Sequence, residues 1–106
     1  MAKYLVQASY TTDGVQGLLK DGGSKRRAAA EQAIKGLGGT LEAFYYAFGD
    51  TDVFAIADAP DNQSAAAVSL AVTASGALRA KITVLMTPEE MDQATKKSVS
   101  YRPPGR

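Results

Sequence analysis

The chain contains no cysteine, no histidine and no tryptophan among its 106 residues. Without cysteine it can form no disulfide, no thiolate nucleophile and no sulfur-ligated metal site. Without histidine it lacks the commonest metal ligand and the side chain most often used for proton transfer near neutral pH. Serine–histidine catalysis, histidine-bound haem and mixed histidine–carboxylate metal sites are therefore excluded. We expect neither a metal nor a cofactor.

Strong charge and long apolar runs are also missing. The formal net charge is +1 at pH 7, so no overall field draws the protein towards nucleic acid or an anionic membrane. The first six residues resemble a strand rather than the apolar core of a signal peptide. No stretch approaches the ~20 apolar residues of a membrane span. These absences predict a cytoplasmic protein that binds neither nucleic acid nor membrane.

The remaining composition suits one globular domain followed by a short tail. Hydrophobic residues make up 45% of the chain and charged residues 22%, an ordinary balance for a folded protein. We assign residues 1–95 to the domain and residues 96–106 to a basic, proline-containing C-terminal tail. The tail is expected to be disordered unless Tyr101 and the prolines pack on a neighbour.

Alternating and helical apolar patterns predict the order strand, helix, strand, strand, helix, strand, with an extra helix at the end. The segment from Thr11 to Gly14 is expected to be a turn, followed by a short helical turn over residues 15–20. The strands are expected at residues 3–10, 40–48, 53–57 and 79–86, and the helices from Ser24 to a stop at Gly38-Gly39, over residues 62–75, and from Pro88 to about Thr95.

Three helix starts carry capping residues. Ser24 and Asp61 are expected N-caps, and Thr87 with Glu90 forms a capping box. Lys25 to Arg27 open the first long helix, where cations oppose the helix dipole. We favour a solvated basic surface for these three residues over the alternative, a contact with an anion.

Two β-α-β crossovers with a hairpin between them predict a ferredoxin-like split β-α-β sandwich of the α+β class. Both main helices should cover one face of a four-stranded antiparallel sheet. The two hairpin strands have no polar face, so the sheet would expose a large apolar patch. A second copy of the chain is the expected cover, which predicts a homodimer built as a dimeric α+β barrel, or a higher oligomer. Alternation places Phe44, Tyr46, Phe48, Phe54 and Ile56 on one face, and Leu41, Ala43, Tyr45, Val53 and Ala55 on the other.

Several segments in this order resemble GYD domain proteins. They are Lys3 to Val6, Ser9 to Thr11, Gly14-Val15, Leu19-Lys20, Arg27 to Ala29, and Leu37 to Glu42. The family is named for a Gly/Tyr/Asp signature at the hairpin, where this chain has Gly49-Asp50-Thr51-Asp52, so Thr51 stands in place of the tyrosine. The resemblance covers about residues 3 to 90 and implies a small, ferredoxin-like, oligomeric protein. It implies no particular activity.

The acidic hairpin tip is the first candidate site. Asp50 and Asp52 could act as paired carboxylates in acid–base chemistry or cation binding. The alternative is a turn whose short polar residues satisfy its own backbone, and we favour it for Gly49 and Asp50. Asp52 remains the best single candidate for a functional side chain because it adjoins the following strand.

The five tyrosines form the second candidate group. A tyrosine brings a large apolar ring and a hydroxyl that needs a partner when buried. Packing is the favoured role, and a pocket lined by tyrosine hydroxyls is the alternative. The catalytic candidates are Asp52 as a base with Tyr10 or Tyr45 as a hydrogen-bond donor. The candidate ligand-binding residues are Tyr4, Tyr46, Asp50, Asp58 and Lys81.

Three functions fit this sequence. The favoured one is a homo-oligomeric binding or regulatory protein that holds a small organic ligand between sheet and helices. The second is a cofactor-independent enzyme, such as a monooxygenase or isomerase, that uses aspartate and tyrosine side chains. The third is a purely structural oligomer. Fold alone does not choose among them, because this scaffold hosts many activities.

Overall fold

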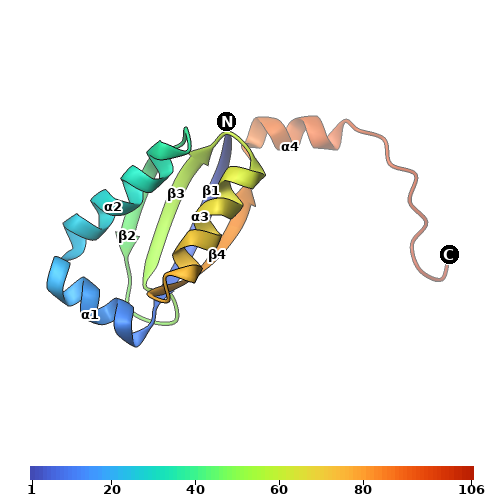
Figure 1. Cartoon of the computed structure of the whole chain (residues 1–106). Helices are drawn as coiled ribbons and strands as arrows, with labels where there is room; N and C mark the ends of the chain where they lie inside the picture. Colours follow the sequence, from blue (N-terminus) through green and yellow to red (C-terminus); the bar gives the residue numbers. More distant parts are fainter.

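The computed structural model describes residues 1–106 and contains four strands and four helices. The strands form one antiparallel sheet in the order β2-β3-β1-β4, and α2 and α3 lie over the same face of it (Figure 1). This is the predicted ferredoxin-like α+β fold. None of the helices has the length and apolarity needed to cross a bilayer. The elements are β1 (Ala2–Tyr10), α1 (Thr12–Asp21), α2 (Gly23–Gly36), β2 (Thr40–Tyr46), β3 (Val53–Ala59), α3 (Asn62–Ala74), β4 (Leu78–Leu85) and α4 (Pro88–Thr95).

The central strand β1 alternates as predicted. Tyr4 and Ala8 are buried on the side that faces the helices. On β3, Ala57 pairs with Tyr4 and Val53 with Ala8, and both of these residues are buried too. Small side chains therefore dominate the centre of the core, and Tyr4 is its one large member.

Strand β2 contains an irregularity that changes which residues share a face. Leu41 pairs with Ala57, but Ala43 pairs with Ile56, so the register shifts by one residue between them. A bulge of this kind switches the side to which the following residues point. Leu41 faces the helices and Ala43 faces away, and the prediction that they share one face is wrong.

The same bulge corrects the predicted aromatic face. After it, Phe44 lies opposite Ala55 and faces the helices, while Tyr45 lies opposite Phe54 and faces away. The aromatic residues are thus divided between the two faces instead of gathering on one. Phe48 lies beyond the end of β2, in the loop before β3.

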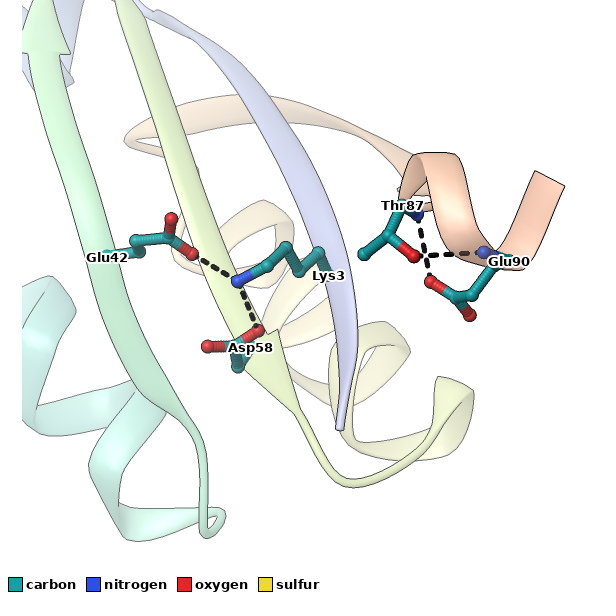
Figure 2. A network of polar contacts seen from close by, with 5 residues as sticks. All are labelled: Lys3, Glu42, Asp58, Thr87 and Glu90. Atoms are coloured by element: carbon teal, nitrogen blue, oxygen red, sulfur yellow. Dashed lines mark hydrogen bonds and ion pairs between the residues drawn. The ribbon is translucent and has the colours of Figure 1, made fainter. Parts of the chain in front are cut away.

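The helix starts confirm two of the three predicted caps. Asp61 accepts a hydrogen bond from the backbone of Ser64, and Thr87 and Glu90 form both bonds of the capping box (Figure 2). Ser24 is not a cap, because α2 begins at Gly23 and Gly22 is its N-cap. Gly22 has φ 84°, a conformation that glycine adopts without strain, and this allows α2 to follow α1 directly.

The predicted turn after β1 is the start of a helix. Thr11 is the N-cap of α1, and its hydroxyl accepts a hydrogen bond from the backbone of Gly14. The predicted short helical turn over residues 15–20 is therefore the middle part of a ten-residue helix. Threonine favours both turns and caps, which is why the local sequence did not separate the two.

The C-terminal segment projects from the rest of the molecule. Helix α4 buries none of its residues, and the chain after Thr95 continues without helix or strand (Figure 1). This projection gives the molecule an elongated shape of 57 × 33 × 22 Å.

Candidate functional site

An apolar groove runs between α2 and α3 over the middle of the sheet; we call it the helix groove. Its volume is about 300 Å³, and 17 of the 20 residues that line it are hydrophobic. This size is at the lower end of the range for small-molecule sites, about 300–1,000 Å³. The groove could therefore enclose a small organic molecule.

Alanine is the reason that the groove exists. The short side chains on the two helices cannot span the space to the sheet, and three of the strand residues beneath them are alanines as well. Ala33 and Ala71 consequently stay exposed although they line the groove from opposite helices. The alanines that line it are Ala8, Ala55 and Ala80 on the sheet, Ala29, Ala30 and Ala33 on α2, and Ala71 on α3.

The polar residues of the helix groove are few. They are Arg26 on α2, Ser69 on α3, and Ser75 just after α3. The hydroxyl of Ser75 already donates to the carbonyl oxygen of Val72 at 2.6 Å. Arg26 is thus the only charged side chain that reaches the groove.

Tyr46 links the end of β2 to the start of α2. Its hydroxyl donates to the carbonyl oxygen of Gly23 at 2.8 Å. Its ring packs edge-to-face against Phe44, with 5.2 Å between the ring centres. Removal of water from the hydroxyl, and then the neighbouring Tyr10, raise the pKa of Tyr46 to about 12, although the side chain keeps some exposed surface. Tyr46 is therefore neutral at physiological pH.

A second hollow lies beside the first, with a volume of about 380 Å³. Tyr10, Tyr46 and Asp52 line it together with apolar residues of α1 and Phe48. Tyr10 also lines the helix groove, so its ring lies between the two spaces. The structure thus brings together three of the predicted site residues, Tyr10, Tyr46 and Asp52.

The carboxylate of Asp52 is held by the backbone of β1. Its Oδ2 accepts the N–H of Tyr10 at 2.9 Å. Its own N–H donates to the carbonyl oxygen of Ala8 at 2.9 Å, and its carbonyl oxygen accepts from Ala47 at 2.8 Å. Asp52 therefore joins the hairpin loop to the end of the central strand, which gives this side chain a structural role.

Asp50 contributes its backbone rather than its carboxylate. The carbonyl oxygen of Asp50 accepts a hydrogen bond from the Ser9 hydroxyl at 2.7 Å. Asp50 does not line either hollow, whereas Asp52 lines the second one. The loop between β2 and β3 is thus fastened to β1 by Ser9 and Tyr10, and the two aspartates have different surroundings.

Tyr4 and Tyr45 lie away from this cluster. Tyr4 is 3% exposed, and its hydroxyl donates to Oδ1 of Asn62 at 2.6 Å, at the start of α3. Tyr45 is 71% exposed on the side of the sheet that faces away from the helices. Within one chain, Tyr45 and Tyr10 therefore cannot act on the same ligand.

Asp58 and Lys81 also lie on the side away from the helices. Asp58 takes part in an ion-pair network in which Nζ of Lys3 contacts Glu42 at 2.5 Å and Asp58 at 3.1 Å (Figure 2). Hydrogen bonds to Glu42 and then to Asp58 raise the pKa of Lys3. The network connects β1, β2 and β3 across the sheet. Lys81 lies on β4, opposite Gln7 of β1.

A ligand site between sheet and helices is among the expectations from the sequence, but two features of the groove, the role of Arg26 and the space between the helices, are not. Arg26 was placed in a solvated basic surface, yet it lines the helix groove. The signal was its spacing, because Arg26 lies on the same stripe of α2 as Ala29, Ala30 and Ala33. The groove itself exists because α2 and α3 lie apart over the sheet. The spacing of residues along a single helix does not predict that separation.

We expect the raised pKa of Tyr46 to make stability depend on alkaline pH. A tyrosine whose pKa rises from 10.0 in the unfolded chain to about 12 when folded stabilises the protein fully below pH 10. That contribution is lost as the pH rises from 10 towards 12. Urea unfolding of Tyr46→Phe should therefore show a shallower loss of stability over this interval than the parent. Tyr101→Phe, in the exposed tail, serves as the control, and identical pH profiles for Tyr46→Phe and the parent would contradict the assignment.

The family comparison covers almost the whole fold. The family model described as the GYD domain matches residues 4–95, from β1 to the end of α4. No curated protein and no solved structure gives a significant match to the chain.

Proposed function

The chain belongs to the GYD domain family, and we propose that it is a homo-oligomeric protein that binds a small organic molecule in the helix groove. The observation that carries this proposal is a space of about 300 Å³ in which 17 of 20 lining residues are hydrophobic. A core that served packing alone would fill such a space, because protein interiors are close-packed.

The energetics of the groove favour occupation by an apolar ligand. Phe44, Val68 and Val72 line it and are only partly buried. Each Å² of apolar surface that a ligand removes from water contributes about 25 cal/mol. The groove walls are helices and strands rather than mobile loops, so little ordering opposes binding.

Filling the groove should abolish ligand binding. We expect compounds from a library of small apolar molecules to raise the melting temperature of the parent by about 10 °C at about 100 times Kd. Ala33→Phe places a large ring over the groove and should remove this response. Ala28→Phe is the matched control, because Ala28 is exposed on the same helix and does not line the groove. A library that stabilises neither protein, or stabilises both equally, would argue against the proposal.

The self-association rests on the face of the sheet that the helices leave uncovered; we call it the open sheet face. Its apolar centre consists of Leu5, Ile56, Phe54 and Tyr45, on three adjacent strands. Phe54 and Tyr45 are exposed, and aromatic residues in such a patch are typical of interfaces. A second copy of the chain offers the same surface and covers this one.

The charges around the open sheet face support a two-fold arrangement. Glu42 lies on the edge strand β2 beside Lys3, near the start of β1. Arg79 lies on the other edge strand, β4, opposite Ser9 near the end of β1. These two charges occupy diagonally opposite corners. A two-fold axis that lies between the two sheets, perpendicular to the line joining these corners, brings Glu42 of each copy to Arg79 of its partner. Complementary charges of this kind fix the register of an interface.

A charge in the centre of the open sheet face should prevent association. We expect native mass spectrometry and analytical ultracentrifugation to show an oligomer for the parent at micromolar concentration, and a monomer for Phe54→Glu, because a buried unpaired carboxylate is strongly disfavoured. Leu70→Glu is the control, since Leu70 is also apolar and is 70% exposed, against 38% for Phe54, but lies on α3. A monomeric parent would overturn this part of the proposal and leave the ligand site unaffected.

A further inference from the structure

The charge inside the helix groove has one sign. Of the residues that line it, Arg26 alone is charged, and no aspartate or glutamate is among them. The apolar walls lower the local dielectric constant, so a single cation there acts more strongly than one in water. A ligand that brings no negative charge would leave this cation with only the carboxylate of Asp21, 3.7 Å away, as its counter-charge.

Arg26 forms a weak ion pair with Asp21. Its guanidinium lies 3.7 Å from the carboxylate of Asp21, and both side chains are about one-third exposed, at 35% and 31%. Ion pairs of this geometry and exposure contribute little to stability. Most of the five N–H donors of Arg26 are therefore free to bind a second carboxylate, for which the guanidinium is well shaped.

The neighbours of Arg26 add no competing negative charge. Tyr10 lines the groove with it, and the hydroxyl of Tyr46 already donates to Gly23. Tyr46 stays neutral through physiological pH, as shown by its raised pKa. Lys25 and Arg27, the adjacent residues on α2, are exposed and positive. Asp21 is the carboxylate paired with Arg26, and Asp52 lines the adjoining hollow rather than the groove, with its Oδ2 bonded to the backbone of Tyr10.

The length of the groove limits the size of the ligand. Arg26 and Ile34 both line it and lie eight residues apart on α2, a distance of about 12 Å at the helical rise of 1.5 Å per residue. That length fits an extended alkyl chain of about ten carbons, given carbon–carbon bonds of about 1.5 Å. Alanines of α2 cover the path between the two ends.

We propose that the helix groove binds an apolar carboxylic acid, with its carboxylate on Arg26 and its hydrocarbon body along the alanines towards Ile34. The inference rests on the proposed function and adds to it the chemical class of the ligand. A medium-chain fatty acid and an aromatic acid of similar length share this chemistry. The carboxylate gives the ligand its orientation, and the hydrocarbon body supplies most of the buried surface.

Isothermal titration with two probes of equal length tests the inference. Decanoate and decan-1-ol differ only in the charged end, and both are used below the concentrations at which they aggregate. We expect decanoate to bind the parent about tenfold more tightly than decan-1-ol, because a hydrogen-bonded charge contributes more than a neutral group. Arg26→Gln should lose this preference, and Arg26→Lys should retain part of it. Arg27→Gln, which alters an exposed neighbour outside the groove, should behave as the parent.

The outcomes separate this inference from the function on which it rests. Equal affinity for the two probes, or an unchanged preference in Arg26→Gln, would overturn the carboxylate assignment while the groove remains a binding site. No binding of decanoate to the parent would also overturn it, and the compound library then decides the proposed function independently. Decanoate binding that persists in Ala33→Phe would place the acid elsewhere on the protein and equally reject the assignment. Melting temperatures of the variants confirm that each one is folded.

Discussion

Gly14→Ala is expected to destabilise the protein by about 3 kcal/mol or to prevent its folding, as overpacking at a rigid site does. Gly14 lies in the first turn of α1, where a Cβ would come within 1.9 Å of the carbonyl oxygen of Ala77 and 2.9 Å of the Tyr10 ring. The Ala77 carbonyl cannot move away freely, because it accepts the backbone N–H of Thr11 at 3.0 Å. The substitution would therefore force α1 away from the start of β4.

The same helix supplies the control for this prediction. Gly17 has open space where its Cβ would lie, and alanine is the better helix former by about 1 kcal/mol. Gly17→Ala should thus stabilise the protein by about 0.5–1 kcal/mol. Urea unfolding followed by circular dichroism, at one fixed protein concentration, measures both variants. If Gly14→Ala proved as stable as the parent, the close approach of α1 to Ala77 would be wrong.

Tyr4→Ala should have the second large effect, a loss of about 3–5 kcal/mol in the free energy of unfolding. Tyr4 is the largest buried residue of a core composed otherwise of glycine, alanine and valine. Its removal leaves a cavity under α3 that the short neighbouring side chains cannot fill, and it also removes the hydrogen bond to Asn62. No other single side chain in this protein gives up so much packing.

Two further tyrosine variants separate the ring from the hydroxyl. Tyr4→Phe keeps the ring and should lose only about 1 kcal/mol, because one hydrogen bond is removed and Asn62 is exposed to water. Tyr101→Ala, in the exposed C-terminal segment, should leave the unfolding transition unchanged. Comparable losses for Tyr4→Ala and Tyr101→Ala would show that Tyr4 does not hold the core together.

Strand and cap positions followed from the sequence where one local rule decided them. In β1, Tyr4, Val6 and Ala8 occupy alternate positions, and all three lie on the helix side of the sheet. The Thr87–Glu90 capping box uses side chains and backbone within a single turn, so no distant part of the chain can change it. Family membership followed from the order of many such local features.

The division of the aromatic residues between the two faces of the sheet could not be predicted from the sequence, because a bulge depends on how two strands pair. Nothing in the sequence from Leu41 to Tyr45 marks a break in the regular alternation of faces along a strand. Its partner β3 has buried alanines at Ala55 and Ala57, and the extra residue in β2 lets Leu41 and Phe44 both lie over them. This choice depends on the volume available beneath the helices, which only the assembled sheet determines.

The candidate site was predicted in part. Tyr10, Tyr46 and Asp52 come together because β1, β2 and the hairpin loop end at the same place. The expected ligand site between sheet and helices agrees with the helix groove in location, but its lining did not follow from the sequence, because alanine stripes on α2 and α3 also suit close helix packing on a sheet. Whether short side chains bring the helices close or leave a space depends on where the connecting loops hold them.

The position of β1 also bears on how the protein folds during its synthesis. The first strand to leave the ribosome is central in the sheet, and its two neighbours are the third and the last. The β2–β3 hairpin can form from contiguous chain, but β1 has no partner until β3 has been made. The other edge of β1 stays unpaired until β4, which ends at Leu85, has been made. Pairing between such distant segments slows folding. Until β3 has been made, Tyr4 and the rest of β1 thus remain an exposed apolar strand, the kind of segment that chaperones bind and that aggregates when it is left uncovered.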